Sequence, residues 1–369
     1  MWIPANARTK RKANQHRSFN AGCLGGTTRE LYRPKYMNTQ KPIEVCITID
    51  TEFSIGGNFE DPALTPVAEP MVLGSVGGKE QGLGFLLDSF AEFGVRATFF
   101  LETLQTAYFG DEPMGGIARR IAAAGHDVQL HLHPCWLHYE ETDGPKPAPN
   151  DSCAGRTDAE LRHFFEFAQS VFSRWGVPAP VAVRTGNFQV DGSVFRLAAE
   201  SGLRLSSSIA VPIYRPPDDG FMLLGGKRRV GRILEFPVFC YSYRIGGSNR
   251  LRPLCITACS AAEIISVLRQ AHAHQLSPVL ILTHPQEYIK KTDFRYASLR
   301  RNRANQGRLR AVLKFLTQHD DEFITTPISS ISDDGTDSGA IGCPVVSVSR
   351  GRAMARMVEN GINDRIWWY

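Results

Sequence analysis

The sequence predicts an α/β protein built on a parallel sheet or barrel. Short runs of alternating or β-branched apolar residues, typical of strands, are followed by longer runs with apolar residues at helical spacing. The order between residues 43 and 132 is strand, helix, strand, helix, strand, which is typical of parallel strands joined by helices. Polar residues stand where these strands end, and the carboxyl ends of parallel strands are where such folds carry their chemistry.

Composition and charge narrow the class of function. The chain has 369 residues, of which 43% are hydrophobic, so it has enough apolar residues for a large buried core. Its formal net charge of +5 owes much to residues 1–38, which carry eight Lys or Arg and one Glu. We expect residues 1–40 to form a flexible, disordered basic tail, without the aromatic-rich basic surface or motif of a specific nucleic-acid-binding protein.

The apolar runs and the cysteines indicate the cellular compartment of the protein. No apolar run approaches the roughly 20 residues of a membrane helix, and the N-terminus lacks the apolar segment of a secretory signal. The eight cysteines are scattered without CxxC pairs, which is typical of a reducing compartment. The sequence therefore predicts a cytoplasmic protein without a transmembrane segment, and it leaves the oligomeric state open.

The first predicted strand, residues 43–49, runs directly into Asp50-Thr51-Glu52. Residues two apart in an extended chain share a face, so the carboxylates of Asp50 and Glu52 lie close together. Like charges at this spacing require a cation or a shared proton. An acidic turn without a ligand is the alternative. The loop that follows, residues 56–78, is too long for a bare connector and is predicted to form a rim of the site.

Two helices and a strand come next. Apolar residues at helical spacing predict a helix over residues 80–93, closed by Gly94. Residues 95–101 are rich in β-branched and aromatic residues and predict a strand. A second helix is predicted over residues 115–124, again followed by a glycine, Gly125.

Residues 125–138, GHDVQLHLHPCWLH, contain the most informative motif. Apolar and polar residues alternate strictly in this stretch, which places His131 and His133 on the same face of a strand. Pro134 ends the strand, so both imidazoles lie at its carboxyl end. Because neutral imidazole is the commonest metal ligand, the pair predicts a metal site. Two half-exposed strand histidines without a ligand are the alternative.

Two later strands also end in a polar residue. Residues 181–183 lead into Arg184, and the very apolar residues 278–283 lead into His284-Pro285. A structural ion pair for Arg184 and a buried core histidine at His284 are the alternatives. The other predicted elements are helices near 157–175, 191–201, 260–274, 303–318 and 350–359, and strands near 203–209, 232–239 and 323–325.

Polar groups from different strand ends thus converge as they do in barrel enzymes. These groups are Asp50, Glu52, His131, His133, Arg184 and His284. Two histidines and one carboxylate leave an open position on a divalent metal, and such a site lowers the pKa of a bound water toward about 7. Metal-assisted hydrolysis is therefore the predicted class of reaction.

In chain order the motifs are Thr48-Ile49-Asp50-Thr51-Glu52, Gly125-His126-Asp127-Val128 running into His131, Arg184, and Leu282-Thr283-His284-Pro285. This order resembles that of the polysaccharide deacetylase family of carbohydrate esterases. The resemblance covers residues 41–330 and leaves residues 331–369 as a short C-terminal extension. It implies an irregular parallel (β/α) barrel of about seven strands, a bound zinc or other divalent ion, and removal of acetyl groups from N-acetylated sugars or a polysaccharide.

The motifs depart from the family's pattern in three places, as in a divergent branch. Thr51 and Glu52 replace the family's second aspartate and its glycine, so Glu52 is expected to be the metal carboxylate. Cys135 replaces the second histidine, so His133 is expected to take over as ligand, with Cys135 or His138 as alternatives. The aspartate that pairs with the family's arginine is not evident in residues 206–208.

The mechanistic hypothesis assigns a role to each of these residues. Glu52, His131 and His133 hold the metal, Asp50 is the general base, Arg184 orients Asp50, and His284 is the general acid that protonates the leaving amine. Hydrolysis of a non-peptide C–N bond in a cyclic amide is one alternative, and a catalytically inactive barrel that acts as a binding protein is another. Aromatic residues predicted near the rim suit a sugar or a planar ring equally; they are Phe53, Trp136, Phe188 and Tyr214.

Removing residues 1–38 should leave the melting temperature nearly unchanged. The segment shows no hydrophobic period, so it cannot bury enough surface to offset the entropy lost on ordering. Thermal unfolding of the full and the shortened chain checks this. A large drop in melting temperature would show that the segment packs on the rest of the protein.

Overall fold

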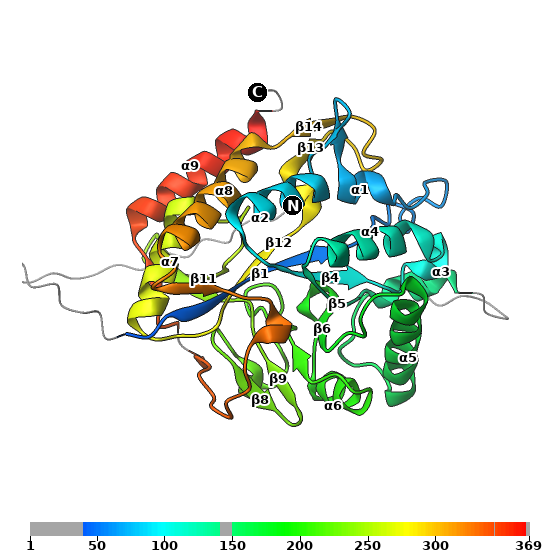
Figure 1. Ribbon diagram of the computed structural model, residues 1–369, viewed down its shortest axis with the longest axis horizontal. Coiled ribbons are helices and arrows are strands. Elements are labelled where there is room, and N and C mark those ends of the chain that lie inside the picture. Colours follow the sequence, from blue (N-terminus) through cyan, green and yellow to red (C-terminus); the bar gives the residue numbers. More distant parts are fainter. Residues whose placement is uncertain (1–39, 141–149, 343, 367–369) are drawn as a thin grey trace, which may run out of the picture. The chain divides into compact units, whose positions relative to one another are not determined.

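The computed structural model describes residues 40–140, 150–342 and 344–366, so the predicted basic tail lies outside the described residues except for Gln40. The main sheet has the strand order β12-β1-β4-β5-β6-β7-β9-β8, and β15 also pairs with β1 (Figure 1). Its strands are β1 (Ile43–Thr51), β4 (Thr98–Glu102), β5 (Asp127–Leu132), β6 (Ala182–Thr185), β7 (Leu205–Ser206), β8 (Arg228–Val230), β9 (Ile233–Glu235), β12 (Val279–Thr283) and β15 (Phe323–Thr325).

The strands from β12 to β9 pair in parallel throughout, and only the β8–β9 pair of this path is antiparallel. The sheet curls, and irregular segments after β9 connect its far edge to β12. The Phe239 amide donates to the Leu280 carbonyl at 3.1 Å, and the Ile256 amide donates to the Leu282 carbonyl at 3.0 Å. These observations confirm the predicted irregular (β/α) barrel of about seven parallel strands.

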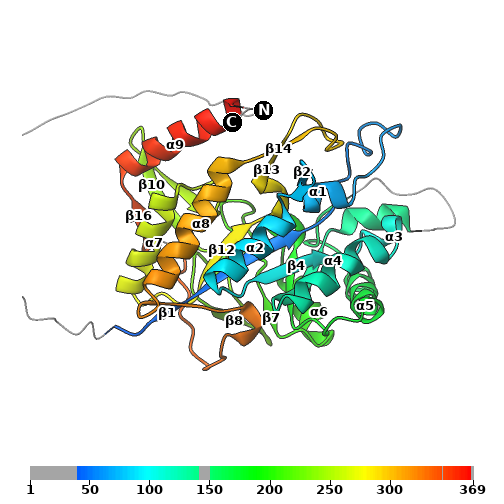
Figure 2. The same cartoon turned by 45° about the horizontal axis from the view of Figure 1, so that its top comes forward.

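Helices cover the outer face of the curled sheet (Figures 1 and 2). They include α2 (Leu83–Phe93), α4 (Glu112–Ala123), α5 (Asp158–Trp175), α6 (Gly192–Glu200), α7 (Ala261–Ala273) and α8 (Arg303–Gln318). Capping boxes begin α5 at Thr157 and α7 at Ser260, and left-handed glycines end α2 and α5. Helix α2 begins three residues later than predicted, because Lys79–Glu80 form β3, which pairs with β2 (Ser75–Val76).

The two-residue period of the strands divides their side chains between two layers. On β1, Val45, Ile47 and Ile49 face the helices and join the large core, whereas Cys46 joins a smaller cluster on the inner face. That inner cluster consists of Cys46, Phe100, Ala182, Leu205, Leu234, Phe236, Leu280, Ile328 and Ile331. Asp50 has the same parity as Cys46, so it points inward at the carboxyl end of the barrel.

The remaining elements lie around the barrel. Residues 344–366 pack on it through β16 (Ser347–Val348), which pairs with β10 (Cys240–Ile245), and through α9 (Arg350–Arg365). The others are β11 (Ser248–Pro253), the hairpin β13 (Ile289–Lys291) and β14 (Leu299–Arg301), the short helices α1 (Glu69–Leu73) and α3 (Thr106–Phe109), and 3-10 turns at Pro134–Tyr139, Gly186–Phe188, Asp219–Phe221, Pro285–Tyr288 and Ile328–Ser330. Among the described residues, none of the helices has the length and apolar composition needed to cross a membrane.

Candidate metal and catalytic site

Three potential ligand atoms meet at the carboxyl ends of β1 and β5. The Glu52 Oε2 atom lies 2.7 Å from His133 Nε2 and 3.6 Å from His131 Nε2. Glu52 directly follows β1, His131 lies near the end of β5, and His133 follows that strand as the N-cap of the Pro134–Tyr139 turn. The two-residue spacings in both motifs therefore bring the carboxylate and the two imidazoles together.

Hydrogen bonds on the far side of each ring fix which nitrogen is available. His131 Nδ1 lies 2.8 Å from the carbonyl oxygen of Arg184, and a carbonyl only accepts, so Nδ1 carries the proton. His133 Nδ1 lies 2.7 Å from Asp151 Oδ2, so it donates to that carboxylate in the same way. In neutral imidazole the lone pair is then on Nε2, and both Nε2 atoms face Glu52.

This donor set fits a divalent metal ion. Burial raises the pKa of the Glu52 carboxyl, but the charges and hydrogen bonds of His133 and His131 outweigh it and hold that pKa well below its usual range. Burial lowers the pKa of His133, but Glu52 and Asp151 outweigh it and raise that pKa well above its usual range. Without a metal, a proton on His133 satisfies the carboxylate. Two imidazoles and one carboxylate are also the protein ligands of a common class of catalytic zinc site.

Asp50 and Arg184 form a buried ion pair directly beside these residues. Arg184 NH1 donates to Asp50 Oδ1 at 2.6 Å, and the two side chains are 0% and 4% exposed. The other carboxylate oxygen, Oδ2, lies 3.9 Å from His284 Nε2. The structure therefore brings together all six residues that the sequence placed at strand ends.

Among the described residues, the other hydrogen bonds of the Arg184 guanidinium go to hydroxyl and carbonyl oxygens. Its Nε donates to the Ser207 carbonyl at 2.9 Å, and its NH2 donates to the Ser207 hydroxyl at 2.7 Å and to Thr48 Oγ1 at 3.0 Å. The guanidinium also lies over the Phe100 ring, 4.2 Å from its centroid. Ser207 thus supplies both a carbonyl and a hydroxyl oxygen to the guanidinium.

His284 is oriented by Glu287, which the sequence reasoning missed. His284 Nδ1 lies 3.2 Å from Glu287 Oε1, and the Thr283 hydroxyl donates to Glu287 Oε2 at 2.8 Å. Burial lowers the pKa of His284, but the carboxylates of Glu287 and Asp50 outweigh it and raise the pKa to about 9. The imidazole is therefore protonated at neutral pH. The available signal was the spacing of His284 and Glu287, which is that of a capped turn directly after a strand.

Asp151 is the second residue that the sequence reasoning missed. It lies in an irregular segment rich in turn residues, where no periodicity singles it out. Besides bonding His133, it accepts from the Cys135 amide at 3.4 Å. His133, Cys135 and Asp151 form a second group whose potential ligand atoms lie within 4.8 Å of one another. Burial, followed by the charge of Asp151, raises the pKa of the Cys135 thiol far above its usual range, which disfavours a thiolate ligand there.

His138 belongs to neither ligand group among the described residues. Its ring packs edge-on against Phe59, with centroids 5.6 Å apart. The imidazole of His133, rather than that of His138, therefore lies beside Glu52.

A buried acid completes the inner face beside the histidines. Glu102 is the register partner of His131 at the end of β4 and is 0% exposed. Its Oε1 accepts from the Leu104 amide at 2.6 Å, and its Oε2 has no hydrogen-bond partner among the described residues. Burial raises the pKa of Glu102 to about 7. A carboxylate oxygen left without a partner here is consistent with a site that receives a further positive or donating group.

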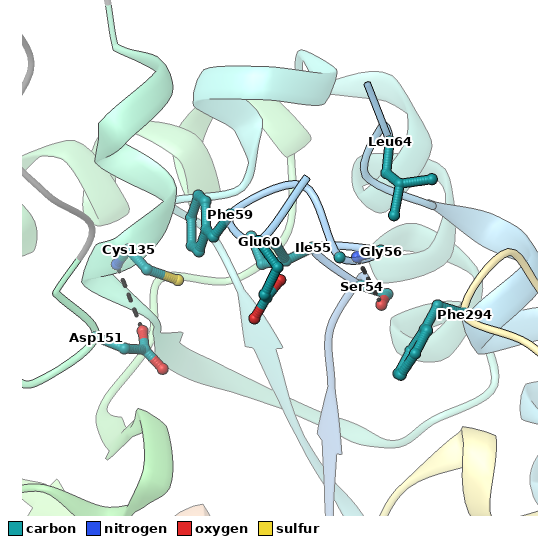
Figure 3. A pocket seen from close by; sticks show the side chains of 10 residues that line it. Ser54, Ile55, Gly56, Phe59, Glu60, Leu64, Cys135, Asp151 and Phe294 are labelled. Atoms are coloured by element: carbon teal, nitrogen blue, oxygen red, sulfur yellow. Dashed lines mark hydrogen bonds between the residues drawn. The ribbon is translucent and has the colours of Figure 1, made fainter. Parts of the chain in front are cut away.

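A cavity of about 610 Å³ adjoins the site through Asp151. Figure 3 shows Phe59 and Phe294 on different sides of it, with Glu60 between them and Cys135 and Asp151 at one end. The rest of the lining comes from residues 54–64, so the predicted role of the loop after β1 as a rim is supported.

The prediction that four aromatic residues lie near the rim was wrong for three of them. Phe53, Trp136 and Phe188 are buried, because they pack in the core beneath the loops.

No protein-family model matches the chain, and no curated protein matches it. Among solved structures, it is similar to a chain described as a polysaccharide deacetylase from Mycobacterium smegmatis, with 19% identity, a TM-score of 0.46, and 79% of this chain and 89% of that chain covered.

Two further solved structures are similar to the chain. One is a family 4 carbohydrate esterase from Streptomyces lividans in complex with acetate, with 12% identity, a TM-score of 0.41, and 82% of this chain and 99% of that chain covered. The other is a family 4 pseudoenzyme from Bacillus anthracis, with 11% identity, a TM-score of 0.41, and 79% and 66% covered. The strand-end motifs resemble the family that these descriptions name.

Replacing either histidine should empty the metal site. We expect His131→Ala and His133→Ala each to lose bound metal, because each removes one of three ligands, whereas Cys135→Ser should retain it. Asp151→Asn should weaken binding by roughly 10- to 100-fold through the lost orientation of His133. Metal analysis of protein purified without chelator measures this. An empty site in Cys135→Ser would show that the thiol is a ligand.

A methyl group at residue 186 should displace His133. A Cβ at Gly186 would lie 2.4 Å from His133 Nδ1 and 2.5 Å from its Cε1, so the ring must move. We expect Gly186→Ala to lower zinc affinity by at least about tenfold in calorimetric titration. Gly192→Ala is the matched control, because a Cβ there meets nothing within 4 Å. Equal zinc affinity of the two variants would contradict this placement of His133.

Proposed function

We propose that this chain is a metal-dependent hydrolase that removes acetyl or similar acyl groups from N-acetylated sugars or a polysaccharide. The proposal rests on how the three potential metal ligands, a carboxylate and an imidazole lie relative to one another. The ligand atoms of Glu52, His131 and His133 converge directly beside a carboxylate, Asp50, whose second oxygen faces a protonated imidazole, His284. Hydrolysis of an amide needs a base for water and an acid for the leaving nitrogen, and both are present on one face.

The proposed metal site would activate both the water and the acyl group. A divalent ion, most simply zinc, held by Glu52, His131 and His133 would lower the pKa of a water and polarise the acyl carbonyl. The chain's own contribution is to fix both imidazoles through the Arg184 carbonyl and Asp151.

Asp50 is the proposed general base. Its Oδ1 is occupied by Arg184, so Oδ2 is the oxygen that accepts the proton from water. The buried guanidinium of Arg184 holds the carboxylate in place through Oδ1 and leaves Oδ2 open toward His284. As water adds to the acyl carbon, its proton passes to Asp50.

His284 is the proposed general acid. Glu287 holds its Nδ1, so the Nε2 proton points to the space beside Asp50. When the C–N bond breaks, this proton goes to the leaving nitrogen, which departs as an amine while the acyl group departs as a carboxylic acid. A group kept protonated at neutral pH is suited to this step.

The cavity supports a sugar as the substrate. Its volume of about 610 Å³ is in the range of sites that enclose a ligand larger than a single small ring. Phe59 and Phe294 offer aromatic faces, and Glu60 offers a carboxylate that can accept hydrogen bonds from sugar hydroxyls. Asp151 lines this cavity and bonds His133, so a sugar bound there would lie next to a residue of the ligand group.

Asp50→Asn should lower turnover by at least about 10²-fold, with metal retained. The amide keeps the shape of the side chain and can still accept from Arg184, but it cannot take the proton from water. Steady-state rates on an N-acetylated sugar oligomer and metal content measure the two effects. A full-rate Asp50→Asn enzyme would exclude Asp50 as the base.

His284→Ala should remove the alkaline limb of the pH–rate profile. Because the pKa of His284 is raised to about 9, the imidazole is protonated at neutral pH and loses its proton as the pH rises through that value. The charge of a bound ion lowers this pKa, so the limb lies at or below about 9.

The loss of rate in His284→Ala should be smaller for an ester than for an amide, because an alkoxide leaves more easily than an amine. A variant with the full wild-type profile on an amide would contradict the role of His284. A variant that loses its metal would make His284 a ligand instead.

A further inference from the structure

Helix α9 presents its apolar residues outward. Met354, Met357, Val358 and Ile362 are 63%, 50%, 61% and 51% exposed, and we call them the α9 stripe. Met354, Val358 and Ile362 follow at intervals of four residues and so lie along one line of the helix surface. A surface helix ordinarily has the opposite arrangement, with its apolar side toward the core.

The side of α9 that faces the protein is largely polar. Arg356 is 3% exposed and pairs with the buried Glu263 of α7 at 3.0 Å, and Glu359 pairs with Arg308 of α8 at 3.3 Å. The Asn360 amide donates to the Ala258 carbonyl at 3.4 Å. The helix is therefore anchored by ion pairs and hydrogen bonds, and the α9 stripe takes no part in holding it.

Apolar surface continues from the α9 stripe into a cavity. A hollow of about 560 Å³ lies between the beginnings of α7 and α8 and helix α9, and Ile362 lines it. Small residues form half of its lining, and the polar side chains of the Arg308–Glu359 ion pair and of Asn363 form most of the rest. The hollow thus offers space beside the α9 stripe with both apolar and charged walls.

Basic residues lie on α9 and on the hairpin that contacts its end. The β13–β14 hairpin, residues 289–301, carries five Lys or Arg and one acid, Asp293. It contacts the end of α9, because Lys290 Nζ donates to the Asn363 carbonyl at 2.6 Å. Helix α9 itself carries four arginines, of which Arg356 is buried, and two acids. Basic residues beside an apolar helix face are typical of segments that lie in a membrane interface.

We propose that α9 and the β13–β14 hairpin dock this protein on an anionic lipid surface. The α9 stripe enters the apolar boundary, and the surrounding Lys and Arg meet lipid phosphates. Charge selects this partner over a second copy of the chain. A two-fold interface would place a patch with eight basic residues, the buried Arg356 left out, and three acidic residues against itself, and like charges in apposition are unfavourable.

Docking in this way would bring the cavity of the proposed active site close to the lipid surface. Phe294, at the tip of the same hairpin, lines that cavity and is 67% exposed. Arg295 NH2 donates to the Thr65 hydroxyl at 3.0 Å, which ties the hairpin to the loop after β1. The inference itself does not depend on the proposed chemistry, because vesicle binding is measured without turnover.

Vesicle sedimentation of the full chain tests the proposal. The wild type should sediment with vesicles of phosphatidylcholine containing about a third phosphatidylglycerol, bind neutral phosphatidylcholine vesicles more weakly, and be released as salt is raised. The triple-serine variant, Met354→Ser/Val358→Ser/Ile362→Ser, should have an at least about tenfold lower partition coefficient between vesicles and water. Its three apolar side chains no longer enter the interface. Arg350→Glu/Arg365→Glu should lower binding to the anionic vesicles alone.

The matched control removes exposed apolar residues elsewhere. Ile213→Ser/Ile324→Ser changes side chains that are 47% and 49% exposed, and it should bind as the wild type does. The melting temperature of each variant confirms folding. Wild-type protein that ignores anionic vesicles would overturn the proposal. So would a triple-serine variant that binds undiminished, because the binding would then belong to another basic part of the chain. A wild-type dimer that only the triple-serine variant dissociates, with vesicle binding unchanged, would assign the face to a second copy.

Discussion

The buried side chain of Arg184 connects the two halves of the proposed site. A guanidinium that is 0% exposed is unfavourable unless it is paired and fully hydrogen-bonded, and here Asp50, Thr48 and Ser207 satisfy it. The carbonyl of the same residue fixes the ring of His131. One residue at the end of β6 thus orients both the proposed base and a proposed ligand. Loss of its partner at Asp50 would leave a buried charge without compensation, so catalysis and stability are linked at this point.

The placement of His133 shows how a change in a motif is accommodated. The side chain at position 135 is a cysteine that lines the cavity, and the imidazole two residues earlier reaches Glu52 instead. Two neighbours make this position possible. Asp151 accepts from the far nitrogen of the ring, and Gly186 leaves the space that the ring occupies. The ligand group therefore depends on segments that lie far apart in the sequence.

Periodicity in the sequence was sufficient to predict most of the strands, most of the helices and the six residues at the strand ends. A two-residue period indicates on which face of a strand a side chain lies. Because parallel strands also bring their carboxyl ends together, these six residues could be predicted to lie close to one another. Periodicity says nothing about irregular segments. Asp151, which fixes His133, and residues 236–239 and 254–256, which connect the sheet edge to β12, lie in such segments. The burial of Phe53, Trp136 and Phe188 also depends on tertiary packing, which no local pattern contains.

Anomalous diffraction from crystals grown with zinc tests most directly whether Glu52, His131 and His133 bind the metal. We expect one strong peak about 2.0–2.2 Å from a Glu52 carboxylate oxygen and from the Nε2 atoms of both histidines. The second ligand group shares only His133 with the first and would use its Nδ1 atom together with Cys135 and Asp151. A peak at that second group, or no peak at either group, would contradict the account.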